Sequence, residues 1–267
     1  MSLSRRTAGI VAFSVVFLLP VFFMFSGSLR EPGLAPPDGF EWLPEKAEWS
    51  NYRNVFYLVP LARATLNSGI VALMAVPLTV LIGSWAGFAI VASSRKISRR
   101  LIALSLIALI IPVSALWVPR FVIFRWLGLI DTPWALAAPA LMATTPFFVL
   151  LFAIAYARIP RQLFEAAQLE GASPFRVWWK VAFPLGRFAT FAVAMLALVW
   201  HWSNFIDPLL YVTSESNATL PLALRALQSL EPTNYPLLMA GAVLATVVPL
   251  VAFAVAQRAL FSRALDV

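Results

Sequence analysis

The chain has no cysteine, a single histidine and few charged residues, and each scarcity excludes a class of function. Without cysteine there can be no disulfide, no thiolate nucleophile and no cysteine-ligated metal. His201 has neither a second metal ligand nor a partner base evident in the sequence, so we expect a packing or interfacial role for it rather than catalysis. Charged residues make up 12% of the chain, against about a quarter of a soluble globular domain.

Most residues of the chain are apolar. Hydrophobic residues make up 61% of the 267 residues, and the mean hydropathy is +0.84. These values predict an all-α, polytopic membrane protein. The net charge of +8 does not indicate nucleic-acid binding, because the basic residues lie at the ends of apolar runs rather than on one stripe.

Six apolar segments are long enough to cross a bilayer, whose hydrocarbon core needs about 20 residues of helix. The first is longer than the apolar region of a signal peptide, which has about 7–15 residues, so we expect it to be retained. The predicted transmembrane helices are residues 7–25, 66–92, 101–118, 134–157, 188–205 and 237–260.

The loops between these segments differ in charge. On one side they carry thirteen of the twenty basic residues and three of the twelve acidic ones; the other side has the remaining seven and nine. Because cytoplasmic loops are enriched in Lys and Arg, both termini are predicted to be cytoplasmic. The same rule places the polar segment of residues 159–184 in the cytoplasm.

That polar segment interrupts the apolar chain and is predicted to fold as two short helices. Pro160 suits the first turn of a helix, Gly171 suits its left-handed end, and Pro174 suits the start of the next helix. Apolar and small residues recur at helical spacing through Leu163, Ala166 and Ala167. We therefore expect a compact, charged elbow that is offered to a soluble partner.

The residues of the elbow resemble the EAA loop of ABC-importer permeases. The match consists of Glu165-Ala166-Ala167, then Gly171 after a spacer of three residues, then Phe183-Pro184. In that family the loop forms a coupling helix that docks into a cytoplasmic ATPase. The resemblance implies that the residues that contact the ATPase are Glu165, Ala166, Ala167, Glu170, Gly171, Ala172 and Phe175.

Further motifs are similar to those of carbohydrate-importer permeases of the maltose type. They include Asn51-Tyr52 followed by Phe56, the turn at residues 127–132, and Thr145-Pro146. The resemblance implies a type I ABC-importer permease fold with residues 1–63 as first helix and extracytoplasmic segment and 64–267 as core. It implies a multi-pass protein of a bacterial or archaeal inner membrane that forms half of a pore for a sugar or related polyol.

The same resemblance implies a set of partners. They are a homologous second permease, two copies of an ATP-binding subunit, an extracytoplasmic solute-binding protein and membrane lipid. No cofactor is expected in this chain, because no Gly is followed by Lys and the phosphate-binding G-x-x-x-x-G-K-[ST] loop is absent. ATP and Mg²⁺ would be bound by the partner ATPase, and this chain would not be an enzyme.

Aromatic and amide side chains at the outer end of the fifth segment indicate a substrate pathway. Aromatic faces stack on sugar rings and amides exchange hydrogen bonds with hydroxyls. An interfacial aromatic belt is the other explanation. The candidates for the pathway are Trp117, Trp202, Asn204 and Phe205.

Several motifs have two explanations. Residues 51–56 either contact a partner protein or anchor the chain at the membrane surface. Gly83 and Gly87 form a G-x-x-x-G that predicts close helix packing. Arg120 and Arg125, near the outer mouth, either suit a phosphorylated substrate or pair with Asp131 or lipid phosphates.

Two other functions compete with that of an ABC permease. A stand-alone secondary transporter couples to ions through buried acids or unwound helices, but none of the six segments has a charged residue in its middle. An intramembrane hydrolase needs a Ser nucleophile with a base within hydrogen-bond reach. The single histidine and the absence of G-x-S-x-G argue against this function.

Overall fold

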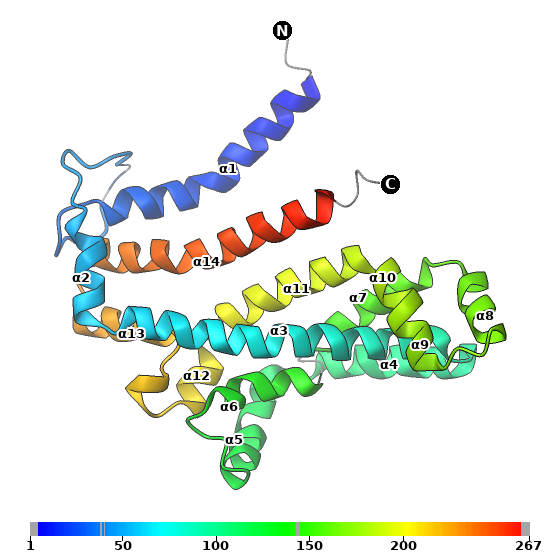
Figure 1. Cartoon of the computed structure of the whole chain (residues 1–267). Helices are drawn as coiled ribbons and strands as arrows, with labels where there is room; N and C mark the ends of the chain where they lie inside the picture. The colour runs from blue at the N-terminus through cyan, green and yellow to red at the C-terminus, as the bar shows by residue number, and fades with distance from the viewer. Residues whose placement is uncertain (1–4, 38, 40, 143–144, 263–267) are drawn as a thin grey trace. The chain divides into compact units, whose positions relative to one another are not determined.

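The computed structural model of the chain describes residues 5–37, 39, 41–142 and 145–262. Every regular element in these ranges is a helix (Figure 1). The chain divides into two compact units, residues 1–65 with 219–251 and residues 66–218 with 252–267. The fold is therefore all-α, as the composition predicts, and each unit is described by itself.

The larger unit contains the elbow and the helices that support it. Its order along the chain is the main part of α3 (Leu61–Ala92), α4 (Arg95–Ile110), the 3₁₀ turn η1 (Val113–Leu116), α5 (Trp117–Trp126), α6 (Pro133–Ala137), η2 (Ala138–Met142), α7 (Pro146–Ala157), α8 (Arg161–Leu169), α9 (Pro174–Val177), the π-helical turn η3 (Trp178–Ala182), α10 (Phe183–Leu185), α11 (Arg187–Trp202), α12 (Ile206–Tyr211) and η4 (Glu215–Asn217).

Close packing of α3 on α7 forms the centre of this unit. A Cβ added to Gly87 would lie 2.6 Å from Phe152 Cβ and 2.9 Å from Ala153 N, so only a glycine fits there. At Gly83 the nearest atom, on the Phe152 ring, is 3.6 Å away. The structure confirms that the G-x-x-x-G packs helices together, with Gly87 at the closest approach.

The predicted helix 101–118 is wrong as a single straight element. α4 ends at Ile110, and the pair formed by α4 and residues 113–126 is bent by 89°. Pro112 has no N–H to donate and disfavours helical backbone at the residue before it, so Ile111 is extended, with φ −69° and ψ 117°. Trp117 consequently begins a new helix, α5.

A second sharp bend separates the elbow from α11. Helical residues 174–185 meet α11 at 82° through Gly186. A Cβ at Gly186 would lie 2.5 Å from the Tyr156 ring, so a side chain there would push α11 away from α7. The predicted segment 188–205 corresponds to α11, which ends at Trp202. Pro146 is the first residue of α7, and Thr145 is its N-cap.

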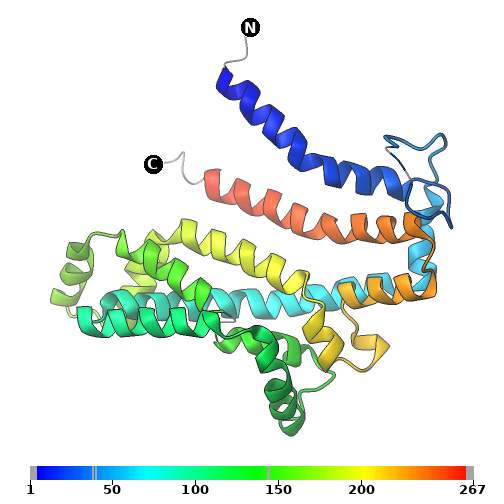
Figure 2. The same ribbon diagram turned by 180° about the vertical axis from the view of Figure 1, so that it is seen from behind.

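The smaller unit contains α1 (Arg5–Ser28), α2 (Ser50–Leu58), α13 (Leu220–Leu230) and the first part of α14 (Tyr235–Ser262). α1 and α14 approach each other at Gly27, where an added Cβ would lie 3.5 Å from Met239 Cγ, near the end where α2 lies (Figures 1 and 2). Asn51 is fully buried and donates to the carbonyls of Ser28 and Arg30 at the end of α1. The first residues of the motif at 51–56 therefore hold the end of α1 in place, which neither sequence-based explanation included.

Two helical stretches, Leu61–Ala92 and Tyr235–Arg258, are each long and apolar enough to cross a membrane. Counting each of three bent helix pairs as one span raises the number to five. The apolar part of α1, Phe13–Ser28, is shorter than these two stretches. Six spans and the division at residue 63 stay predictions.

Candidate functional site

The elbow of residues 159–184 has the two-helix form that its glycine and prolines predict. α8 ends in a Schellman motif, in which Gly171 N–H donates to Gln168 O at 2.9 Å and Ala172 N–H to Ala167 O at 3.0 Å. Gly171 has φ +78°, the left-handed conformation that glycine adopts without strain. Pro174 is the first residue of α9. Pro160 lies just before α8 rather than in its first turn.

Aromatic side chains attach the elbow to α3. Phe164, 8% exposed, meets the edge of Phe88 with ring centroids 5.8 Å apart. Trp178 lies against Trp85 at 4.9 Å. Such ring pairs contribute about 0.5–1.5 kcal/mol beyond the area they bury. Both ends of the elbow are therefore fixed to one helix.

A buried hydrogen-bond network adds a directional link between the elbow, α3 and α7. Trp178 Nε1–H donates to Ser84 Oγ at 2.8 Å, and the Ser84 hydroxyl lies 2.6 Å from the Tyr156 hydroxyl. Ser84 is fully buried, so removing its hydroxyl would leave two polar groups without this partner. The network fixes the position of η3 relative to the two long helices.

The outer surface of the elbow combines acidic and apolar side chains. Leu169 is 90% exposed, and Phe175 is 59% exposed. Leu169 is not among the predicted coupling residues, whereas Phe175 is. The remaining predicted coupling residues that are exposed are Glu165, Ala166, Glu170 and Gly171. Exposed large apolar side chains on a polar knob are typical of a protein-docking surface.

The apolar and small residues of the elbow do not all lie on one face. Ala167 and Ala172 pack against the core, but Leu163 and Ala166 are exposed, and Phe164 is the buried side chain. Helical spacing alone allows either Leu163 or Phe164 to face the core, because the two apolar residues are adjacent in the sequence. Phe164 is the buried one of the two because its ring packs edge-to-face against the ring of Phe88.

A second candidate site is a cavity of about 360 Å³ between α5 and the junction of α11 with α12. It brings together three of the four predicted pathway residues, Trp117, Asn204 and Phe205. The fourth, Trp202, is 6% exposed and does not line it. The cavity thus joins two segments that lie more than eighty residues apart in the chain.

Polar and charged side chains other than the predicted pathway residues also line this cavity. They are Arg120, His201, Ser203 and Asp207. Asn204 Nδ2–H donates to Asp207 Oδ2 at 2.8 Å, which orients both side chains. His201 Nε2 and Asp207 Oδ1 are buried without a hydrogen-bond partner in the described part of the chain. Buried polar atoms beside aromatic rings are suited to exchange hydrogen bonds with a hydroxylated ligand.

Asp131 joins the turn after α5 to the segment after α12. Its Oδ1 accepts from the backbone N–H groups of Thr213 and Ser214, each at 3.0 Å. These hydrogen bonds, led by that from Ser214, lower the pKa of the Asp131 carboxyl below its usual 3.8. The predicted pairing of Asp131 with Arg120 or Arg125 is wrong, because neither arginine forms an ion pair with Asp131 in the described residues and the carboxylate Oδ1 accepts hydrogen bonds from Thr213 and Ser214 instead.

Metal binding has no support in the described residues, where no group of three or more metal-ligating side chains occurs. The two sites are thus an exposed docking surface and a polar cavity lined with aromatic rings.

Residues 79–266 match the family described as binding-protein-dependent transport system inner membrane component. This chain belongs to that family. The family prediction is therefore confirmed, as is the prediction that the chain is a membrane transport component and not an enzyme. The elbow and the cavity both lie within the matched region.

Similar proteins come from several bacteria. The lactose transport system permease protein of Rhizobium radiobacter is 28% identical over 212 residues, which cover 79% of this chain and 77% of that protein. The trehalose transport system permease protein of Mycobacterium tuberculosis is 29% identical, with coverage of 88% and 86%. A putative ABC transporter permease protein of Streptomyces antibioticus is 30% identical, with coverage of 82% and 96%.

The fold of this family member is also that of a solved structure. The structure of a bacterial ABC transporter involved in the import of the acidic polysaccharide alginate superposes with a TM-score of 0.69 at 21% identity. The superposition covers 97% of this chain and 98% of the other. The all-α fold of an ABC-importer permease is therefore established.

Proposed function

We propose that this inner-membrane component is one of two permease subunits of an ABC importer for a sugar or a related polyol. Its relatives are named for lactose, trehalose and arabinooligosaccharide transport. The cavity lined by Trp117, Asn204 and Phe205 combines stacking faces with hydrogen-bonding groups, which is the chemistry that a sugar requires.

The observation that best supports the coupling role is that the elbow has an exposed outer surface and is firmly attached to α3 and α7. Its outer surface is exposed, while Phe164 and Trp178 fix it to α3 and the Ser84 hydroxyl links it to α7. A partner that moved this surface would therefore move α3 and α7 with it. We propose that the partner is an ATP-binding subunit, two copies of which bind ATP and Mg²⁺ for the transporter.

The charge distribution supports the orientation of the proposal. Both termini and the elbow would face the cytoplasm, where ATP is available, because the loops on that side hold most of the basic residues. A homologous permease would complete the pore. A solute-binding protein, which the family name includes, would deliver substrate on the opposite side. ATP binding would bias a two-state arrangement of the helices.

Cysteine crosslinking tests the coupling role, because the chain supplies a cysteine-free background. Leu169→Cys is the best probe, since Leu169 is 90% exposed, whereas Ala167 packs against the core. Trp126→Cys is the matched control, because Trp126 is 86% exposed but belongs to α5. We expect Leu169→Cys alone to capture an ATP-binding subunit, with a yield that changes when ATP is added.

Two results of this crosslinking experiment would contradict the coupling role. If neither variant captures an ATPase in membranes that contain the complete transporter, the coupling role is wrong, and a stand-alone transporter becomes the better explanation. If both do so equally, the crosslink reports collision rather than docking.

A further inference from the structure

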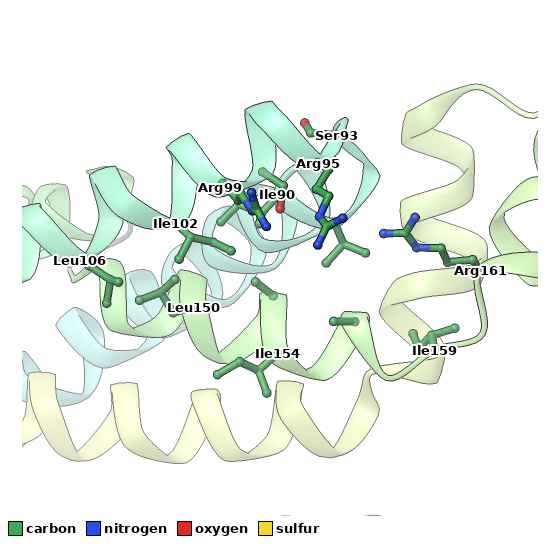
Figure 3. Close-up of a pocket in the computed structure, with 14 residues that line it drawn as sticks. Ile90, Ser93, Arg95, Arg99, Ile102, Leu106, Leu150, Ile154, Ile159 and Arg161 are labelled. Carbon is green, nitrogen blue, oxygen red and sulfur yellow. The ribbon is translucent and has the colours of Figure 1, made fainter.

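A cavity of about 420 Å³ in the larger unit is separate from the cavity near Asn204 and shares with the elbow only Ile159 and Arg161 (Figure 3). It lies between α4 and α7, with the end of α3 and the start of α8 at one end. Its volume exceeds that of the cavity near Asn204, and no predicted pathway residue lines it. It therefore needs an explanation of its own.

The cavity has two chemically distinct ends. At one end are Arg95 and Arg99 on α4 and Arg161 at the start of α8. Figure 3 shows the guanidinium groups of Arg95 and Arg161 facing one another across the opening, with Arg99 beside them. Along the other end run Ile102 and Leu106 from α4, opposite side chains of α7.

None of the three arginines forms an ion pair in the described residues, although Glu165 lines a neighbouring pocket together with Arg161. None of the residues that line the cavity is acidic, and the ion pairs found in the described ranges, Arg30–Glu41 and Lys46–Glu48, lie elsewhere. Positive guanidinium groups that line one cavity repel one another. An anion between them would remove this repulsion and accept forked hydrogen bonds, as phosphate does.

The apolar end identifies the source of that anion. A small soluble phosphate would be held by the arginines alone and would leave the groove beside Ile102 and Leu106 unused. α4 continues as an exposed apolar surface through Leu104, Ile107 and Ile110, which suits contact with acyl chains. A ligand that is anionic at one end and apolar along the other matches both halves of the cavity.

We propose that this cavity binds an anionic phospholipid. The headgroup phosphate lies between Arg95, Arg99 and Arg161, and one acyl chain follows the groove between α4 and α7. Basic pockets between helices at the cytoplasmic face bind such headgroups in other membrane proteins. Because Arg161 begins α8, the lipid also joins α4 to the elbow. The lipid site does not depend on the elbow being the ATPase contact.

Native mass spectrometry of the full chain, purified with any subunits that accompany it, tests the proposal. The probes are phosphatidylglycerol and phosphatidylcholine with identical acyl chains, titrated into detergent. The pocket variant is Arg95→Gln/Arg99→Gln/Arg161→Gln. The control variant, Lys96→Gln/Arg100→Gln/Arg158→Gln, loses the same charge from neighbouring exposed residues that do not line the cavity.

We expect the wild type to retain phosphatidylglycerol in preference to phosphatidylcholine. The pocket variant should bind phosphatidylglycerol at least about tenfold more weakly, since each basic residue near a headgroup contributes to binding. The control variant should stay within about twofold of the wild type. Because all the substituted side chains are exposed, neither variant should lose its fold.

Three outcomes would overturn the proposal. Equal loss in both variants would mean that the lipid senses general surface charge. Complete displacement of phosphatidylglycerol by millimolar glycerol phosphate would mean that the site takes a soluble anion. Equal retention of the two lipids by the wild type would mean that the cavity has no preference for a negative headgroup.

Discussion

Replacing Gly87 with alanine should weaken the packing of α3 on α7. The added methyl carbon would lie 2.6 Å from Phe152 Cβ and 2.9 Å from Val149 O, where ordinary contacts begin at 3.4 Å. Both atoms belong to or adjoin the backbone of α7, so no flexible side chain can move aside. The helices must separate by several tenths of an ångström, and overpacking of this kind costs about 1–3 kcal/mol.

Gly83→Ala is a control on the same helix and the same face. Its methyl group would meet Phe152 at 3.6 Å, an ordinary contact. Both substitutions gain the same helical preference, about 1 kcal/mol, so this gain cancels when the two variants are compared. The stability difference between them therefore isolates the overpacking cost of about 1–3 kcal/mol.

Thermal unfolding in detergent, followed by size-exclusion chromatography after heating, measures this difference. One kcal/mol corresponds to about 2–4 °C in a chain of this size, so Gly87→Ala should unfold several degrees below Gly83→Ala. If the two variants unfold at the same temperature, the close approach at Gly87 does not exist and the reasoning fails.

Four further predictions follow from the sites. Asn51→Leu should lower stability by about 1–3 kcal/mol in thermal unfolding, because the carbonyls at the end of α1 lose their donor; unchanged stability would contradict the capping role. Asp131→Asn should cost about 1 kcal/mol at neutral pH. Because folding lowers the pKa of this carboxyl, its contribution is present above pH 3.8 and is lost as the pH falls through the folded value, so the variant should differ from the wild type less in acid. Gly171→Pro should abolish transport while the protein still inserts, since proline cannot adopt φ +78° or donate its N–H; full uptake of the substrate would sink the coupling role. Asn204→Ala should reduce uptake at least about tenfold while ATP hydrolysis still responds to the binding protein, because a substrate hydrogen bond and the contact with Asp207 are lost; normal uptake would remove Asn204 from the pathway.

Local signals in the sequence were sufficient for several elements. Gly171 and Pro174 predict the turn and the second helix of the elbow, because backbone freedom at glycine and a fixed φ at proline act on immediate neighbours. The same kind of signal should have revealed the break at Pro112, which the length of the apolar run concealed. The length of an apolar run indicates whether a segment can cross a bilayer, but it contains no information about where the helix axis bends.

The sequence by itself determined an apolar, helical chain with a polar elbow, because composition, helical spacing and turn residues act locally. Only the tertiary structure decided which side of α8 is buried, since Phe164 and Leu163 are equally apolar until Phe88 lies beside one of them. It also decided that Trp117 and Asn204 share a cavity whereas Trp202 does not line it. Contacts between segments far apart in the chain depend on how helices pack, and that packing has no signature in a single stretch of sequence.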